Sequence, residues 1–138
     1  PLSLIMLDLD HFKGLNDQYG HDFGDQALPA VASLLAGSRR AGDLSARWGG
    51  VEFLLLLPET ALGEAHALAE RLRQAIQAIA LRAGEQPVSL SCSCGVVQRT
   101  EQEQLEHLIN HADRLLYAAK QSGRNRVVAA DPAQPACT

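Results

Sequence analysis

Paired acidic residues end the first apolar stretch of the chain. Asp8 and Asp10 follow the run LSLIML, which is typical of a buried β-strand over residues 2–9. Because side chains alternate across a strand, we expect both carboxylates on one face, where they would suit a hard cation with phosphate ligands. The alternative is an ordinary solvated strand end with a helix cap.

A Gly-Gly turn provides a second candidate. The stretch RWGGVEF covers residues 47–53 and is followed by LLLLP, which predicts a β-hairpin with strands over 44–48 and 53–57. Gly49 and Gly50 permit a tight turn and a close approach of the backbone to a phosphate. Val51 and Glu52 come next. The stretch is therefore either a plain hairpin or a catalytic turn that has lost a carboxylate.

Polar residues in two other segments suit a nucleotide. In NDQYGHDFGD, Asn16 and Asp25 can read the edge of a base, although Asn, Asp and Gly are also ordinary turn residues. In KQSGRNR, Lys120 and Arg124 follow a predicted helix. They either clamp a phosphate or simply interact favourably with the carboxyl end of that helix. Each signal is weak alone, and their combination and order carry the argument.

Hydrophobic periodicity predicts the elements that position these residues. Asp25 and Thr60 are the predicted N-caps of the second and third helices. The order β-α-α-β-β-α-β-α-β predicts an α+β fold with a ferredoxin-like β-α-β-β-α-β core, an extra helix and an extra C-terminal strand, and with helices on one face of an antiparallel sheet. Strands are expected over residues 2–9, 44–48, 53–57, 88–97 and 126–130, and helices over 11–19, 25–38, 60–80 and 105–121.

Composition narrows the class of protein. The length of 138 residues suits one domain, and the net charge of −4 argues against a nucleic-acid polymer as partner. No apolar run is long enough to span a membrane, and we expect no membrane contact by this domain. Cys92, Cys94 and Cys137 favour reduced thiols in a cytoplasmic protein. The abrupt start suggests a domain of a longer protein, and DPAQPACT suggests a disordered tail over 131–138.

The motifs together resemble those of GGDEF domains, the diguanylate cyclases that make cyclic di-GMP. The resemblance covers nearly all of residues 3–130 and implies a nucleotidyl-cyclase-like palm. The first helix of the family, with its Leu-Thr-x-Leu-x-Asn-Arg signature, is missing, so we expect a single GGDEF domain over 1–130 that lacks this helix. The matching stretches are LDLDHFKGLNDQYGHDFGDQAL, RAGDLSARWGGVEFLLLLPET, AERLRQAI and ADRLLYAAKQSGRNRV.

The resemblance implies a cation site with one ligand lost. In this family two facing domains each hold one GTP, and the two GTP molecules are joined with release of pyrophosphate. Mg²⁺ or Mn²⁺ would bind the carboxylate of Asp8, the carbonyl of Leu9 and the acidic third residue of the turn, which here is Val51. Glu52 is a weak substitute, because on an extended segment it faces away from position 51. The catalytic site is therefore expected to be degenerate, with no intact catalytic residue at position 51.

The same resemblance assigns roles in nucleotide binding. Asn16 and Asp25 match the residues that read guanine. Lys120 and Arg124 match those that hold the triphosphate. The pair Gly49 and Gly50 would let the backbone approach the nucleotide.

A separate motif matches the inhibitory site of the family, which binds the product cyclic di-GMP. RAGD places Arg40 and Asp43 at the R-x-x-D positions, with five residues between Asp43 and Gly49. Arg can fork onto guanine O6 and N7, and Asp can accept from guanine N1–H and the amino group. Arg71 matches an arginine that completes this site from another domain. Without the resemblance, an R-x-x-D pair is an exposed loop contact of little energetic value.

Three functions follow as hypotheses. The first is a degenerate domain that binds cyclic di-GMP as a receptor or regulatory module. The second is a working cyclase that tolerates Val51, with GTP and Mg²⁺ or Mn²⁺ bound. The third is a dimer scaffold that binds no nucleotide. The substitution at position 51 favours the first hypothesis over the second, and the intact pair of Arg40 and Asp43 favours it over the third.

Overall fold

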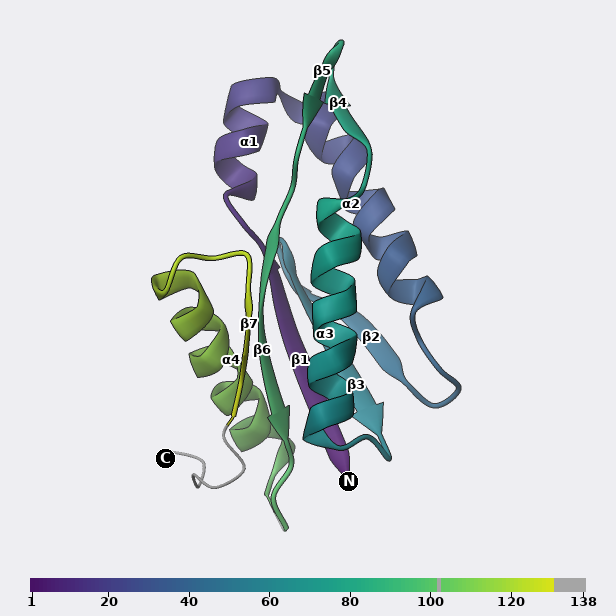
Figure 1. The fold of residues 1–138 in the computed structure, drawn as a ribbon, viewed down its shortest axis with the longest axis vertical. Coiled ribbons are helices and arrows are strands. Elements are labelled where there is room, and N and C mark those ends of the chain that lie inside the picture. The colour runs from purple at the N-terminus through teal and green to yellow at the C-terminus, as the bar shows by residue number, and fades with distance from the viewer. Residues whose placement is uncertain (102, 131–138) are drawn as a thin grey trace.

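The computed structural model describes residues 1–101 and 103–130. Its main feature is a five-stranded sheet in the order β2-β3-β1-β6-β7, with the strands running along the long axis of the molecule (Figure 1). The elements in chain order are β1 (Leu2–Leu9), α1 (Phe12–Tyr19), α2 (His21–Gly37), β2 (Leu44–Gly49), β3 (Glu52–Pro58), α3 (Leu62–Gln77), β4 (Leu81–Ala83), β5 (Gln86–Val88), β6 (Cys92–Gln98), α4 (Leu105–Gln121) and β7 (Val127–Ala129).

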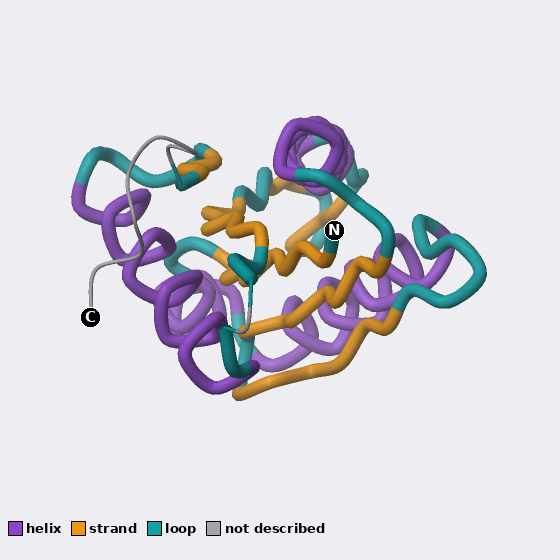
Figure 2. Tube along the Cα trace, turned by 90° about the horizontal axis from the view of Figure 1, so that it is seen from below, coloured by secondary structure: helices purple, strands orange, loops and turns teal. Residues whose placement is uncertain are grey.

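Strand β1 lies at the centre of the sheet because its residues are apolar on both faces. Ile5 and Leu7 belong to the larger core with α2 and α3, whereas Leu4 and Met6 belong to a second core with α4. Helices therefore cover both faces of the sheet (Figure 2). The prediction of helices on a single face is wrong, because a central strand without polar alternation must be buried on both sides.

The sheet is mixed, whereas the sequence predicted an antiparallel sheet. Strands β1, β2, β3 and β6 pair antiparallel, but β7 pairs parallel to β6, with Cys94 opposite Val127. Strand β6 begins at Cys92, and the segment before it forms the separate β4–β5 hairpin, which was not predicted. The α+β class and the order of the other elements are confirmed.

Two predicted helix caps are wrong. Asp25 lies inside α2, which begins after Gly20, and the N-cap of α3 is Ala61. Gly20 ends α1 as predicted and has a φ of 88°, a left-handed backbone that favours glycine. A single glycine can therefore end one helix and start the next, so α2 begins four residues earlier than its predicted cap.

Glycine at position 95 allows α4 to lie unusually close to the sheet. A Cβ atom there would be 2.2 Å from the Ala112 carbonyl oxygen and 2.5 Å from the Leu116 nitrogen, which are both backbone atoms of α4. No side chain other than hydrogen fits at this distance. The middle of α4 is thereby held against β6, and its last turn reaches Asp8 on β1 through Lys120.

Among the described residues, no helix is long and apolar enough to cross a membrane. Cys92 and Cys94 are free thiols buried on β6. A hydrogen bond with Cys92, together with burial, raises the pKa of the Cys94 thiol, so it stays protonated at neutral pH. Cys137 and the predicted tail lie outside the described residues.

Candidate functional site

The first group of candidate residues gathers where β1 ends. Asp8 is directly opposite Glu52 in the pairing of β1 with β3, so both side chains share the face of the sheet that α4 covers. Lys120, in the last turn of α4, forms an ion pair with Oδ2 of Asp8. Among the described residues, the buried Oδ1 atom of Asp8 has no hydrogen-bond partner. The structure thus brings together two carboxylates and one ammonium group.

Glu52 lies in an unfavourable electrostatic environment. Burial, together with the nearby carboxylates of Asp8 and Asp113, raises the pKa of Glu52 above its usual value. The Lys120 ammonium only partly offsets this effect. That ammonium is in direct contact with the Asp8 carboxylate.

Val51 faces the opposite side of the sheet from Glu52. Its side chain packs at the edge of the larger core, and its carbonyl accepts a hydrogen bond from the Leu9 N–H at 3.3 Å. The turn itself is held by Arg47, whose Nε donates to the Gly50 carbonyl at 2.8 Å. Position 51 therefore supplies no side-chain oxygen near Asp8 and Lys120. Glu52 lies on the same face of the sheet as these two residues, whereas Val51 does not.

The residues present do not fit a complete divalent-cation site. Across residues 1–101 and 103–130, no cluster of three or more His, Cys, Asp or Glu side chains is arranged to hold a metal. Two carboxylates share a face, but one of them is already neutralised by Lys120. A site for Mg²⁺ or Mn²⁺ normally needs carboxylate and phosphate oxygens in octahedral geometry. The protein by itself offers too few ligands for that.

Asp10 does not form the second half of a carboxylate pair. It is only 4% exposed, and it accepts hydrogen bonds from the Ser91 and Ser93 hydroxyls, each at 2.7 Å, and from the Asn125 N–H at 3.0 Å. These bonds use both of its oxygens. The expectation that Asp8 and Asp10 jointly serve a cation is wrong, because Asp10 fixes the loop after α4.

Of the two predicted phosphate-binding residues, Arg124 lies on that fixed loop, whereas Lys120 belongs to the last turn of α4. Arg124 has a left-handed backbone with a φ of 62°, and its N–H donates to the Ala119 carbonyl at 3.0 Å. Asn125 follows with its amide held by Asp10, and its side-chain oxygen accepts from Arg73 Nη1 at 3.0 Å. The structure thus places Arg124 beyond the end of α4, whereas Lys120 is already paired with an acid.

The predicted guanine-reading residues lie on α1 and α2. Oδ1 of Asn16 is buried without a hydrogen-bond partner among the described residues. The same atom would lie 2.7 Å from a Cβ at position 24, so Gly24 is what leaves room for it. Asp25, the next residue, is exposed. The structure therefore leaves an unsatisfied amide oxygen beside Gly24, and the exposed Asp25 follows that glycine on α2.

A different cavity brings together the residues of the R-x-x-D motif and Arg71. It has a volume of about 240 Å³ and lies between the end of α2, the end of β3 and the first turns of α3. Arg40 and Arg71 both line it, within one chain. Among the described residues, the Arg71 side chain makes no hydrogen bond or ion pair. The full lining is Ser38, Arg40, Thr60, Glu64, Ala67, Leu68 and Arg71.

The Arg40 guanidinium is fixed in place by buried groups. The carboxylate of Asp43 is 3% exposed, and its Oδ2 accepts from the Arg40 backbone N–H at 2.9 Å and from Nε at 3.5 Å. The buried Thr60 hydroxyl accepts from Nη2 of the same guanidinium and donates to the Pro58 carbonyl at 2.9 Å. Asp43 thus orients Arg40, and is not itself open to a ligand.

Sequence reasoning did not identify two residues of this cavity, Thr60 and Glu64. Glu64 and Arg71 are seven residues apart on α3, which places them on the same face two turns apart. That spacing, read within the predicted helix, could have placed Glu64 beside Arg71. Thr60 gave no signal of this kind, because only the folding of β3 against the α2–β2 loop brings it to Arg40.

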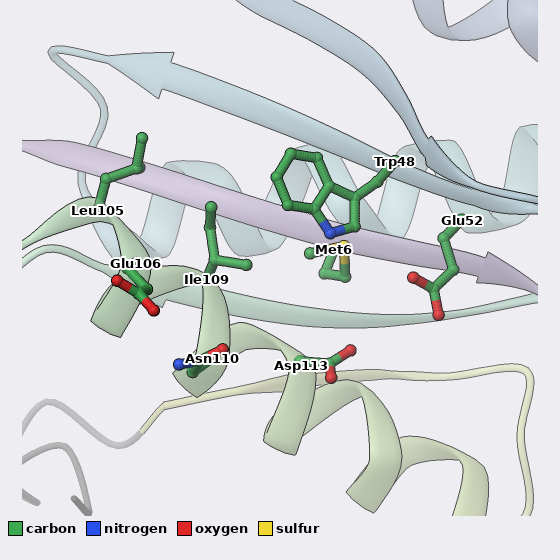
Figure 3. Close-up of a pocket in the computed structure, with 8 residues that line it drawn as sticks. All are labelled: Met6, Trp48, Glu52, Leu105, Glu106, Ile109, Asn110 and Asp113. Carbon is green, nitrogen blue, oxygen red and sulfur yellow. The ribbon is translucent and has the colours of Figure 1, made fainter.

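A larger groove, of about 400 Å³, lies between the β2–β3 hairpin and α4. Its floor is apolar and its edge is acidic, as Figure 3 shows, with Glu52 and Asp113 at the same end. The carboxylates oppose the binding of an anion such as a nucleotide phosphate. The groove is lined by Met6, Trp48, Glu52, Leu105, Glu106, Ile109, Asn110 and Asp113.

Comparisons with known proteins show the family to which the fold belongs. The family model described as "Diguanylate cyclase, GGDEF domain" matches residues 1–126. Diguanylate cyclase VdcA of Vibrio cholerae is 48% identical over 130 residues, which are 92% of this chain and 38% of that protein. The chain spans only 19–38% of the length of the first curated relatives that it matches.

Two solved structures are also similar. The GGDEF domain of DgcB from Caulobacter crescentus, in complex with c-di-GMP, has a TM-score of 0.88 at 35% identity and covers 93% of this chain and 77% of that one. Diguanylate cyclase SiaD from Pseudomonas aeruginosa, in complex with its activator SiaC, has a TM-score of 0.87 at 43% identity, over 94% of this chain and 50% of that one. The chain therefore belongs to the GGDEF domain family of diguanylate cyclases.

Proposed function

We propose that this chain is a degenerate GGDEF domain that binds cyclic di-GMP and acts as a receptor or regulatory module in cyclic di-GMP signalling, without cyclase activity. The observation that carries this proposal is the cavity into which Arg40 and Arg71 both project, with one guanidinium held by a buried carboxylate. Cyclic di-GMP is a dianion with two guanine bases. Two arginines in one cavity suit both its charge and its base edges.

The Arg40 guanidinium is preorganised for this ligand. A guanidinium has five N–H donors, of which Asp43 takes the one on Nε and Thr60 takes one on Nη2. The remaining three donors lie on the Nη edge and can fork onto guanine O6 and N7 or onto a phosphate. Since Asp43 is occupied and buried, we assign it to the positioning of Arg40, and not to direct reading of the base.

The absence of cyclase activity is proposed from the end of β1. Position 51 has no carboxylate, and Lys120 already neutralises Asp8. A metal-dependent attack on GTP therefore lacks the ligands that it needs. The competing function is an active cyclase, and one observation favours it: Oδ1 of Asp8 has no partner in the described residues and Glu52 lies directly opposite. GTP could supply further oxygen ligands there.

Calorimetric titration with cyclic di-GMP tests the proposal. Arg40→Ala should weaken binding about 5- to 150-fold, because each bidentate base contact contributes about 1–3 kcal/mol. The neighbouring Arg39→Ala removes the same charge from an exposed residue outside the cavity, and should leave the Kd within about twofold. Binding should also survive a chelator, since the cavity holds no metal ligands beyond one carboxylate.

The same titration separates the competing sites. If Arg40→Ala has no effect but Asp25→Ala abolishes binding, the ligand occupies the guanine-reading group on α1 and α2 instead. If the wild-type chain does not bind cyclic di-GMP, the proposal is wrong and the scaffold hypothesis gains. The relatives extend beyond this chain, so we further propose that the receptor acts on other domains of a longer protein, or through a homodimer.

A further inference from the structure

We infer that Glu64 is a built-in competitor for the ligand of the Arg40 cavity and sets its affinity. This inference rests on the proposed function, because it concerns the same cavity. Glu64 is in the first turn of α3, and its Oε2 lies 3.9 Å from Nη1 of Arg40. Nη1 belongs to the one edge of the guanidinium that Asp43 and Thr60 leave open.

The three partners of Arg40 differ in how easily a ligand can displace them. Asp43 is 3% exposed and Thr60 is buried, and each makes a direct hydrogen bond to the guanidinium. Glu64 is 63% exposed, and its contact is the longest of the three. Exposed ion pairs of this kind are weak. An incoming base or phosphate therefore replaces Glu64 and leaves the other two contacts intact.

Displacement does not remove the negative charge of Glu64 from the cavity. Its side chain lines the same space as Ala67 and Leu68, which carry no compensating charge, while Arg71 lies two turns further along α3. A dianionic ligand that reaches Arg40 must accept this carboxylate as a neighbour. Repulsion between unit charges about 4 Å apart amounts to about 1 kcal/mol even in water, which is about fivefold in Kd.

Two effects therefore act in the same direction. Loss of the Glu64–Arg40 pair and repulsion of the ligand both weaken binding, so removing the charge should tighten it. We expect Glu64→Gln to lower the Kd for cyclic di-GMP by about 3- to 10-fold, with a smaller gain at high salt because exposed charges are screened. The side chain is exposed, so the substitution leaves the packing of α3 unchanged.

The matched control is Glu85→Gln, which changes the net charge equally. Glu85 is exposed in the turn between β4 and β5, at the opposite end of the molecule from the start of α3 (Figure 1). Calorimetry with cyclic di-GMP should therefore give the wild-type Kd for this variant. If Glu85→Gln lowered the Kd as much as Glu64→Gln does, the effect would come from net charge alone and the inference would be overturned.

The outcomes also separate this inference from the proposed function. If the wild type binds and Glu64→Gln binds equally or more weakly, the competitor role is wrong while the receptor function stands. Weaker binding would mean that Glu64 accepts hydrogen bonds from guanine. If the wild type shows no binding and Glu64→Gln gains it, the competitor role is supported, while the receptor function of the wild-type chain is wrong. If neither chain binds, both proposals are wrong.

Discussion

Asp10 offers the sharpest test of how the site is built, because a single side chain connects three segments. Its carboxylate accepts hydrogen bonds from the hydroxyl of Ser91, just before β6, and from that of Ser93, on β6. It also accepts one from the Asn125 N–H after α4. We predict that Asp10→Ala lowers the free energy of unfolding by about 3–5 kcal/mol. Hydrogen bonds to a charged group contribute about 1.5–3 kcal/mol each, and the total is less than their sum because the serine hydroxyls can rotate to new partners.

Equilibrium unfolding in urea measures this change. With a urea m-value of about 2 kcal/mol/M, a loss of about 4 kcal/mol moves the midpoint down by about 2 M. Domains of this size have a stability of about 5–15 kcal/mol, so the variant should still fold. Amide hydrogen exchange gives a second readout, because the Asn125 N–H loses its acceptor and should exchange faster than in the wild type.

Two further variants make the reasoning refutable. In Asp10→Asn, the amide oxygen can still accept from Ser91 and Asn125 while its NH₂ group donates to Ser93, so the loss should be only about 1 kcal/mol. Asp17→Ala, at an exposed position on α1, should change stability by less than about 0.5 kcal/mol. If Asp10→Ala costs less than 1 kcal/mol, or if Asp10→Asn is as harmful as Asp10→Ala, the hydrogen-bond account is wrong.

Three other predictions concern packing, charge and catalysis. Gly95→Ala should destabilise by about 3 kcal/mol in urea unfolding, because its Cβ meets the α4 backbone, whereas Gly14→Ala, with open space around it, should be slightly stabilising. The raised pKa of Glu52 means that ionisation of this side chain opposes folding. The resulting loss of stability is absent at about pH 4 and present at neutral pH. Glu52→Gln should therefore raise the urea midpoint at about pH 7 and leave it unchanged at about pH 4. Chromatography of the wild-type chain incubated with GTP should show no cyclic di-GMP, and turnover that Asp8→Ala abolishes would contradict the role given to Val51.

The parts of the fold with unambiguous apolar patterns were predictable from the sequence. Strand β1 and helix α4 have the predicted bounds, because one is a continuous apolar run and the other repeats Leu108, Ala112 and Leu116 at helical spacing. The β4–β5 hairpin was not predictable in this way. Its strands have three residues each, and Pro87 lies within one of them, which weakens a strand signal.

The candidate site was predictable only in part, since its contacts depend on tertiary packing. Nothing in the local sequence around Lys120 indicates that α4 crosses the face of β1 that carries Asp8. Likewise, periodicity does not show that Asp10 faces serine hydroxyls while Asp8 faces an ammonium group. The association of Arg40 with Arg71 came from the family resemblance, and the structure adds that both line a cavity within one chain.

The groove between the hairpin and α4 also gives the chain an optical label. Trp48 is the only tryptophan in the sequence, and the residue is 54% exposed over the apolar floor (Figure 3). Indole emission shifts with the polarity around the ring. A ligand at Arg40 lies beyond the other end of β2 and should leave this emission unchanged, whereas displacement of the Gly49–Gly50 turn or entry of an apolar group into the groove should shift it. Intrinsic fluorescence can therefore tell events at these two places apart without any added dye.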